Sequence, residues 1–484
     1  MRFALVLLAV ACAAPSVSNE PVFDTKLDTS PRAQATARDG FTSERLETVL
    51  PRLMAEERIG LWALVAREYN EDPALATMLP ATWRNARRTT ILLCFAGRDG
   101  VERLAVSRYP VGEFFESAWD PAEEPDPWRA FGGLVAERRP RSIALNVSHD
   151  AALADGLTSS LHLQVLKSLP PGSEHGVTLR HRLPVRWLET RTAGERAAYP
   201  QLAAATHELI LAGLRSVEPG RTTTADLAWW FEDQLLAAGF TTWFHPLVSV
   251  QRADGASRGA SFAEREATTT IEPGDLVHVD VGLVWAGLHT DTQHQAYVLL
   301  PGEREAPEGL RAGFRDANRA QDCLTETFRV GAIGNELLAE TRAKLAAANI
   351  DGRIYSHPLG LHGHAAGPLI GLWDEQQSVP GRGNFEVHAN TAWSIELGVS
   401  QPVPEWGGET VEFLVEENAL FDGEEVRYLD GRQVELTLIG TTGAVAHSGF
   451  EARRVRSVFQ HDERGALRAV DEQRVLDQNR LAVE

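Results

Sequence analysis

The order of the predicted elements indicates an α+β protein, in which an α/β domain precedes a larger domain with two helix pairs on a curved antiparallel sheet. Three observations favour this fold class. Strand-like runs alternate with helical stretches as far as Val185, two helices then stand on each side of a candidate hairpin, and strands and loops follow from His357 to Ile439. The 484 residues are enough for two or three domains with sizeable cores.

The N-terminal segment is typical of a secretory signal. Residues 1–12 contain one basic residue, a short apolar run and then small residues, and the run is too short to span a bilayer. Leu8–Cys12 also resembles the bacterial lipoprotein cleavage box, in which the cysteine carries the lipid. We therefore expect an exported protein, either periplasmic or anchored in the bacterial envelope through Cys12. Residues 13–40 lack periodicity, which predicts a flexible leader.

The α/β domain is expected over residues 41–185. A helical pattern from Thr42 to Met54 opens it, and its strand-like runs are Leu61–Val65, Thr90–Phe95, Leu104–Ser107 and Ser142–Asn146. Because no cluster of catalytic residue types is visible there, we expect a structural or substrate-restricting role. Cys94 lies in one of these runs and is predicted to be a buried thiol. A disulfide with Cys323 stays open in an exported protein.

The second domain is expected over residues 190–445, with a C-terminal extension over 446–484. Its predicted helices are, in chain order, 192–217, 222–239, 305–327 and 335–348. Proline and glycine end the first of these helices, and threonine caps the second.

The acidic composition limits the class of partner. A net charge of −20 and a pI near 5.3 argue against nucleic acid, because phosphate binding requires a basic surface. Outside the N-terminal signal no stretch reaches about 18 apolar residues, so we expect no internal membrane span. A homo-oligomer is left open.

The candidate hairpin around Trp285-Ala286-Gly287 carries two aspartates. If the turn centres between the tryptophan and the alanine, Asp280 lies directly opposite Asp291, where two carboxylates repel each other. The run Leu276–Val281 is apolar on both faces and is predicted to be buried. Because no nearby lysine or arginine can pair with these acids, a cation is the simplest partner. Two metal ions about 3.5–4 Å apart would suit the spacing.

Further donor residues follow toward the C-terminus. Three histidines stand within eight residues in a glycine-rich loop, from His357 to His364, and such a cluster favours a functional role. Glu396 lies in a strand-like run. Glu412 and Glu416 share one face of the next run, so periodicity cannot choose between them.

Taken in order, these residues resemble the pita-bread metallopeptidases, the family of aminopeptidase P, prolidase and methionine aminopeptidase, with creatinase as a metal-free relative. The resemblance covers roughly residues 190–440 and consists of two aspartates eleven residues apart, a Ser-His-x-Leu-Gly box and two strand glutamates. It implies a pita-bread domain behind an N-terminal domain like that of aminopeptidase P. The metal ligands that it implies are Asp280, Asp291, His357, Glu396 and Glu416.

The resemblance also implies individual roles. Asp291 and Glu416 would bridge two ions, and Glu416 is favoured over Glu412 because an acidic pair at this point is typical of the family. His364 would contact the substrate carbonyl, and Glu396 would move a proton to the leaving amine. Four carboxylates and one imidazole suit two divalent ions, manganese first, with cobalt, zinc or iron as alternatives.

The function implied is a dinuclear metal-dependent hydrolase that removes N-terminal residues from peptides, with Xaa-Pro bonds as the finer expectation. A prolidase-like dipeptidase and a pita-bread binding protein with weakened catalysis are the alternatives. Three departures from the family concern substrate handling. Residues 257–270 lack a histidine, with His245 the nearest, Arg353 replaces a histidine before His357, and Leu414 replaces an arginine.

Overall fold

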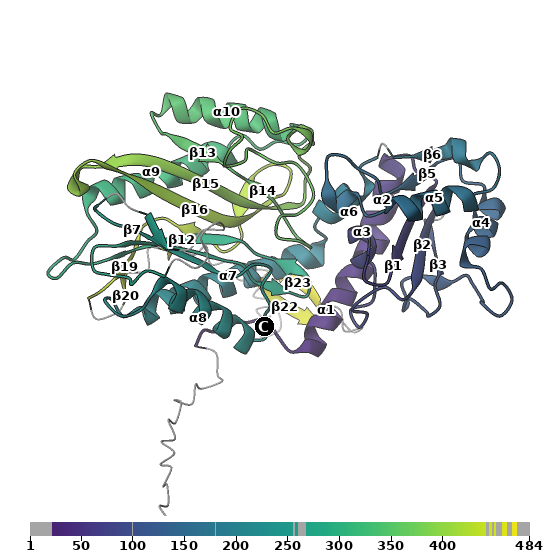
Figure 1. The fold of residues 1–484 in the computed structure, drawn as a ribbon, viewed down its shortest axis with the longest axis horizontal. Coiled ribbons are helices and arrows are strands. Elements are labelled where there is room, and N and C mark those ends of the chain that lie inside the picture. Colours follow the sequence, from purple (N-terminus) through teal and green to yellow (C-terminus); the bar gives the residue numbers. More distant parts are fainter. Residues whose placement is uncertain are drawn as a thin grey trace, which may run out of the picture.

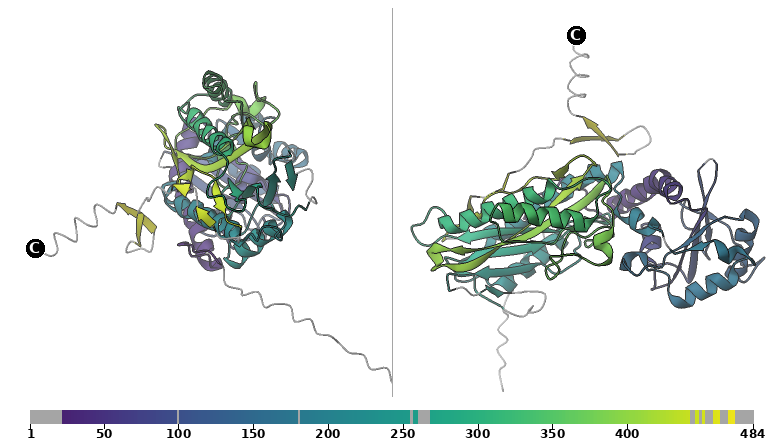
Figure 2. Two further views of the ribbon diagram at one scale, coloured as in Figure 1. Left: turned by 90° about the vertical axis from the view of Figure 1, so that its left-hand side faces the viewer. Right: turned by 90° about the horizontal axis from the view of Figure 1, so that it is seen from above.

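A computed structural model of the chain describes residues 22–441, except for residues 99, 180, 255–256 and 260–267, and short strand segments after 441. The protein has two domains that lie side by side (Figures 1 and 2). The predicted signal segment, including Cys12, the first part of the predicted leader and much of the predicted C-terminal extension lie outside the described residues.

The N-terminal domain is a sandwich around a six-stranded mixed sheet of order β4-β3-β2-β1-β5-β6. Side chains alternate along its central strand β1. Leu61, Ala63 and Val65 pack with α4 and α5 in one core, whereas Trp62 and Leu64 pack with α2 and α6 in another. The elements are α1 (Pro31–Glu44), a π-helical turn (Arg45–Val49), α2 (Leu50–Glu56), β1 (Leu61–Arg67), α3 (Pro73–Ala76), β2 (Thr89–Ala96), β3 (Val101–Val106), β4 (Glu116–Ser117), α4 (Pro127–Arg138), β5 (Ile143–Leu145), α5 (Ser159–Ser168), β6 (Val177–Thr178) and α6 (Leu183–Glu189).

The prediction of a flexible leader over residues 13–40 is wrong from residue 22 onward. Helix α1 begins at Pro31, behind Ser30 as its N-cap. Before it, Phe23 and Leu27 are buried in the core of the C-terminal domain. These two apolar side chains attach the segment to the larger domain. The segment is polar on average, so its composition alone does not predict this contact.

The C-terminal domain is built on an 11-stranded, largely antiparallel sheet whose longest ladder joins β15 and β16. Helices α7 and α8 cover one side of the sheet and α9 and α10 cover the other (Figure 1). This arrangement confirms the predicted α+β fold. The elements are α7 (Ala193–Ser216), α8 (Thr224–Ala237), β7 (Leu247–Gln251), β8 (Ser257–Gly259), β9 (Leu276–Val281), β10 (Val284–Trp285), β11 (Leu288–His289), β12 (Thr292–Val298), α9 (Glu308–Thr325), α10 (Gly334–Ala347), β13 (Gly352–Ile354), β14 (His357–Leu359), β15 (Thr391–Val403), β16 (Glu409–Phe421), β17 (Val426–Tyr428), β18 (Arg432–Gln433), β19 (Thr437–Ile439), β20 (Val445–His447), β21 (Phe450–Glu451), β22 (Ser457–His461) and β23 (Leu467–Asp471).

The register of the hairpin differs from the predicted one. Its two-residue turn consists of Ala286 and Gly287, with φ of 49° and 86°, because a type I′ turn requires positive φ at both central residues. Asp280 therefore pairs with Gln293 rather than with Asp291. Asp291 stands two residues before Gln293, so the pairing is shifted by two residues and the two aspartates still share one face.

Two further expectations concern cysteines and membrane spans. Cys94 and Cys323 are free thiols, and Cys94 is buried as predicted. The alternative of a disulfide between them is therefore wrong for this structure. None of the helices in the described part of the chain combines the length and the apolar character that crossing a membrane requires.

Candidate active site

The structure brings the five predicted ligands together from four strands and the loop before β12. Asp280 lies near the end of β9, His357 begins β14, and Glu396 and Glu416 are direct partners on β15 and β16. Asp291 precedes β12 by one residue. Each of the five residues is at most 8% exposed. Four strands thus hold four of the candidate ligands, and the residue that precedes a fifth strand is the remaining one.

The structure also separates the two glutamates between which periodicity could not choose. Glu416 is buried beside Glu396, with Ser394 donating a hydrogen bond to it. Glu412 lies at an exposed position of the same strand and forms an ion pair with Arg353 at 3.5 Å. Only the first of these glutamates is close to the other candidate ligands.

The spacing around His357 suits a cation. Its Nε2 lies 3.6 Å from Asp291, 3.7 Å from Glu396 and 3.8 Å from Glu416, and has no hydrogen-bond partner among the described residues. Two donor atoms about 2.1 Å from one ion at a tetrahedral angle lie roughly 3.4 Å apart. The buried Oδ1 of Asp280 also lacks a hydrogen-bond partner within the described ranges. Both unpartnered atoms are donors that divalent ions bind.

The ligand atoms fall into overlapping groups. Asp280, Asp291 and Glu416 form one group, and His357, Glu396 and Glu416 form another, with the ligand atoms of each group within 4.8 Å of one another. Asp291 also belongs to a third group, with His357. Asp291 and Glu416 are therefore shared between neighbouring groups, as two bridging carboxylates would be.

The electrostatics of the site explain why it needs positive charge. Burial raises the pKa values of Asp280, Asp291 and Glu396 well above their ordinary range, and the neighbouring Glu416 raises them further. Burial also raises the pKa of Glu416 to about 7. The His357 imidazole has its pKa lowered by burial, so it is held neutral, as a metal ligand must be.

A comparison with known proteins matches the same part of the chain. Residues 197–417 match the model of metallopeptidase family M24. The C-terminal domain thus resembles metallopeptidase family M24, and the names M24 domain and M24 site below refer to this resemblance. The predicted resemblance is thereby confirmed. None of the curated protein sequences matches the chain.

Solved structures with a similar fold cover both domains of the chain. An X-Pro aminopeptidase from Thermotoga maritima is 15% identical with a TM-score of 0.56, and covers 80% of this chain and 99% of its own. An Xaa-Pro dipeptidase from Bacillus anthracis is 16% identical with a TM-score of 0.56, and the match covers 83% of this chain and 99% of the dipeptidase. Zinc-substituted aminopeptidase P from Escherichia coli, in complex with product, is 13% identical with a TM-score of 0.53, and the match covers 83% of this chain and 94% of the aminopeptidase. At such identities the similarity concerns the fold.

Gln293 is a residue of the M24 site that sequence reasoning missed. Its Nε2 donates hydrogen bonds to Glu396 Oε1 at 2.8 Å and to Glu416 Oε2 at 2.7 Å. Its Oε1 lies 2.8 Å from His278 Nε2, and burial lowers the pKa of this histidine to about 4. A neutral His278 donates this hydrogen bond and so fixes the amide of Gln293. The alternation of side chains could have found Gln293, which stands two residues after Asp291.

A cavity of about 320 Å³ opens onto the carboxylates of the M24 site. Its lining residues are Trp243, Phe244, Asp280, Asp291, Gln293, Tyr355, His364, Leu372, Trp373, Asp374, Glu396 and Glu416. The His364 ring lies 4.7 Å from that of His357 and 4.9 Å from that of Trp243, between centroids. His364 thus faces the cavity beside the candidate ligands.

His245, Arg353 and Leu414, which stand at or nearest to the three departures of the sequence, do not line this cavity, and residues 260–267 of the segment without a histidine lie outside the described residues. His245 forms a short hydrogen bond with Glu232 and packs on Trp229, and Arg353 pairs with Glu412. Leu414 packs near Gly398 on β15. None of these three residues lines the cavity, so none replaces the family's missing side chains.

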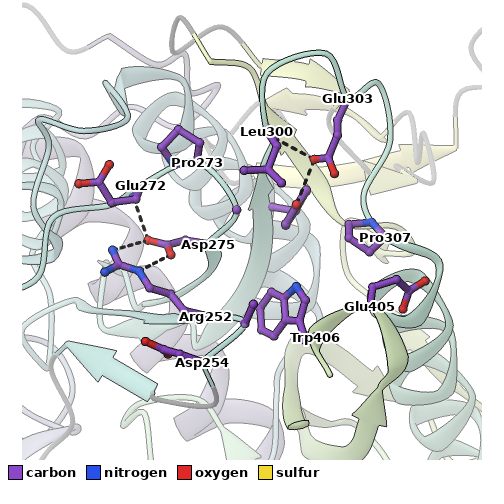
Figure 3. A pocket seen from close by; sticks show the side chains of 13 residues that line it. Arg252, Asp254, Glu272, Pro273, Asp275, Leu300, Glu303, Pro307, Glu405 and Trp406 are labelled. Atoms are coloured by element: carbon purple, nitrogen blue, oxygen red, sulfur yellow. Dashed lines mark hydrogen bonds and ion pairs between the residues drawn. The ribbon is translucent and has the colours of Figure 1, made fainter. Parts of the chain in front are cut away.

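A second hollow of about 660 Å³ lies elsewhere on the M24 domain (Figure 3). The guanidinium of Arg252 on its wall is paired with Asp275 at 2.5 and 2.9 Å. None of the five candidate ligands lines this hollow. The smaller cavity is therefore the candidate active site.

Proposed function

We propose that the protein is a dinuclear metal-dependent peptidase that removes N-terminal residues from peptides, with a preference for Xaa-Pro bonds. The observation that carries this proposal is the pair of buried ligand groups that share Glu416 at the base of an aromatic cavity. The resemblance to the M24 family supports the hydrolase class. The solved structures of similar fold that are named for X-Pro or Xaa-Pro substrates support the finer preference.

The donor set fits two divalent ions. Asp280, Asp291 and Glu416 would hold one ion, and His357 and Glu396 would hold the second together with the two bridging carboxylates. Manganese is the first choice for these hard-to-intermediate donors, with cobalt, zinc or iron as alternatives. When bound, such ions would acidify a water molecule and polarise the scissile carbonyl.

The side chains of the protein supply the remaining chemistry. His364 faces the cavity, so its imidazole can donate a hydrogen bond to the carbonyl oxygen of the scissile bond. Glu396, whose pKa is raised by burial and by Glu416, can accept a proton from the attacking water and pass it to the leaving amine. Trp243 and Tyr355 narrow the cavity and exclude water from the reacting atoms.

The charge of the cavity favours an aminopeptidase over a dipeptidase. Among the described residues that line it there is no lysine or arginine, so the C-terminal carboxylate of a dipeptide has no cationic partner there. The exposed Asp374 also lines the cavity and can pair with the free N-terminal amine of a peptide. The aromatic walls suit an apolar or proline side chain.

The test is to assay the purified protein on Xaa-Pro tripeptides, Xaa-Pro dipeptides and matched peptides with alanine in place of proline. We expect chelator to stop cleavage, added manganese to restore it, and the tripeptide to be the best substrate. Cleavage confined to dipeptides would favour the prolidase-like alternative. Metal binding without hydrolysis of any peptide would favour the binding-protein alternative and contradict the proposal.

We further propose that the protein is exported and that Cys12 carries a lipid anchor, on the basis of the apolar N-terminal run and its terminal cysteine. Fractionation of cells that express the parent protein or Cys12→Ser tests this proposal. The parent is expected in the membrane fraction and the variant in the soluble fraction. The same distribution for both proteins would contradict the anchor.

A further inference from the structure

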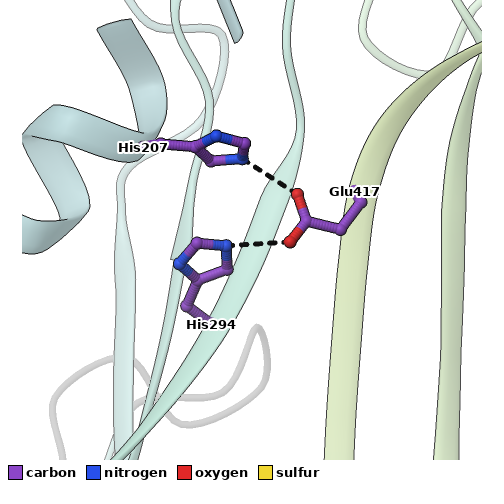
Figure 4. A group of neighbouring side chains, drawn as sticks. All are labelled: His207, His294 and Glu417. Carbon is purple, nitrogen blue, oxygen red and sulfur yellow. Dashed lines mark hydrogen bonds and ion pairs between the residues drawn. The ribbon is translucent and has the colours of Figure 1, made fainter. Parts of the chain in front are cut away.

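Three metal-ligating side chains meet at a second place in the M24 domain. His207 comes from α7, His294 from β12 and Glu417 from β16 (Figure 4). The two imidazoles stack with their centroids 5.2 Å apart, and the carboxylate faces both of them from one side. The three side chains are at most 3% exposed. One ligand atom from each residue lies within 4.8 Å of the other two. This group shares no residue with the candidate active site.

The second group lies on the opposite face of the sheet from the candidate active site. β12 and β16 pair in register at Gln293 and Glu416, both of which belong to the candidate active site. The next residues along the two strands, His294 and Glu417, point to the other face because strand side chains alternate. On that face they meet His207, on the helix that packs against the sheet.

The hydrogen bonds direct the nitrogen atoms of both histidines toward one carboxylate. The Nε2 atoms of His207 and His294 lie 2.9 and 3.0 Å from the two oxygens of Glu417. The Nδ1 of His207 lies 3.0 Å from Asp430 Oδ2. A carboxylate that holds the second nitrogen of a histidine in this way is typical of metal-binding histidines, because it orients the ring and makes it a better ligand.

The charges of these side chains also suit a divalent ion. Burial alone would lower the pKa of His207, but Glu417 and Asp430 raise it to about 9, so this imidazole is protonated at neutral pH. The pKa of His294 is lowered by burial, so this imidazole is neutral. The two carboxylates that contact the imidazoles, Glu417 and Asp430, supply negative charge that attracts a divalent ion.

We propose that His207, His294 and Glu417 form a third metal site, selective for zinc or a similar divalent transition metal, with Asp430 orienting His207. Two histidines and one carboxylate are a donor set that binds zinc. Ligand atoms around one such ion lie roughly 3.4 Å apart, so the hydrogen-bonded atoms need to separate by only a few tenths of an ångström. Binding of the ion would release the Nε2 proton of His207 to the solvent, and His294 would bind through Nε2 as the neutral tautomer that carries its proton on Nδ1.

The third ion would have a structural role. It would connect α7 to β12 and β16 at the level where these strands carry Gln293 and Glu416. The ion would therefore fix the backbone from which the candidate active site is built, without contacting the substrate.

Metal counting on the full-length protein tests the proposal. The protein is stripped with chelator, incubated with excess zinc, desalted and analysed by inductively coupled plasma mass spectrometry. We expect three zinc ions per chain for the parent, and one fewer for His207→Gln. Glu208→Gln is the matched control, since its side chain is exposed on the same helix, and we expect it to bind as many ions as the parent.

A second pair of variants keeps the test decisive if His207→Gln fails to fold. Asp430→Asn removes only the orienting carboxylate and should weaken zinc binding at this site about 10–100-fold. The double variant Asp291→Asn with Glu416→Gln removes a ligand from every group at the candidate active site and should still bind one zinc ion. No bound zinc in this double variant would overturn the proposal, as would an equal count in the parent and His207→Gln. Failure of the proposed function would appear separately, as a parent protein that binds metal and cleaves no peptide.

Discussion

Substitution of Gln293 by leucine isolates the contribution of a residue that holds two candidate ligands without binding metal itself. Leucine approximates the volume of glutamine but removes the hydrogen bonds to Glu396 and Glu416 at 2.8 and 2.7 Å. In each of these glutamates the other carboxylate oxygen faces His357 Nε2, at 3.7 and 3.8 Å. Gln293 therefore holds one oxygen of each carboxylate and directs the other toward the candidate ion position.

The expected magnitude follows from these two contacts. A hydrogen bond to a charged group contributes about 1.5–3 kcal/mol, and loss of a partner that orients metal ligands usually lowers affinity or activity about 10–100-fold. We expect kcat/KM of Gln293→Leu to fall about 10–100-fold, which corresponds to about 1.4–2.7 kcal/mol of lost transition-state stabilisation. Metal affinity should fall with it, because both carboxylates gain freedom to rotate.

The assay compares Gln293→Leu with Gln295→Leu. Gln295 is buried on the same strand and face, but its Nε2 donates to the backbone oxygen of Glu412 at 3.2 Å rather than to a candidate ligand. Both variants are measured for kcat/KM on the best tripeptide, for manganese affinity and for thermal unfolding. If Gln293→Leu keeps kcat/KM and metal affinity within twofold of Gln295→Leu, the assignment of Gln293 as a positioning residue is wrong.

Four other predictions test the site. Asp291→Asn should lower kcat at least about 100-fold and reduce bound metal, because a bridging carboxylate is lost, and metal analysis with peptide assays checks this. Burial raises the pKa of Glu416 from 4.5 to about 7, so the stability that this carboxyl contributes to the metal-free protein is present below pH 4.5 and is lost as the pH rises through 7. Thermal unfolding in the presence of chelator should show this loss of stability. In Glu416→Gln the part of the pH dependence that is due to Glu416 should disappear. Asp374→Asn should raise KM for peptides with a free amine and leave kcat nearly unchanged, as steady-state kinetics would show. Gly363→Ala should lower kcat/KM, because the added Cβ would lie 2.2 Å from the Trp243 ring and push this ring in the cavity wall, whereas the neighbouring Leu361→Ala should have a smaller effect.

The sequence could predict the candidate ligands because their positions follow from strand alternation and from chain order. Asp280, Glu396 and Glu416 lie in apolar runs where a carboxylate without a cationic partner stands out. Their faces remained correct even though the hairpin register was wrong, because a shift of two residues preserves the face. The choice of Glu416 over Glu412 could be made only from the family resemblance, because both side chains share one face of the strand.

Other features could not be predicted because they depend on distant contacts. The segment around Phe23 and Leu27 is polar on average, and only the core of the second domain determines that it is ordered. The alternation of side chains places Gln293 on the face of Asp291, but its hydrogen bonds to Glu396 and Glu416 arise only when β12 pairs with β16 in the sheet. His207 lies within the predicted helix over residues 192–217, and its contact with His294 and Glu417 arises only when this helix packs on the sheet.

The two groups of candidate metal ligands use opposite faces of the same two strands, β12 and β16. On β12 the adjacent residues Gln293 and His294 serve opposite faces, and on β16 Glu416 and Glu417 do the same. A strand can satisfy both faces only if its register is fixed, because a slip by one residue would exchange every pair. The group around His207 holds that register from the helix side, whereas Gln293 holds it from the cavity side. The position of Glu416, and with it the geometry of the proposed catalytic centre, therefore depends on residues on both faces of the sheet.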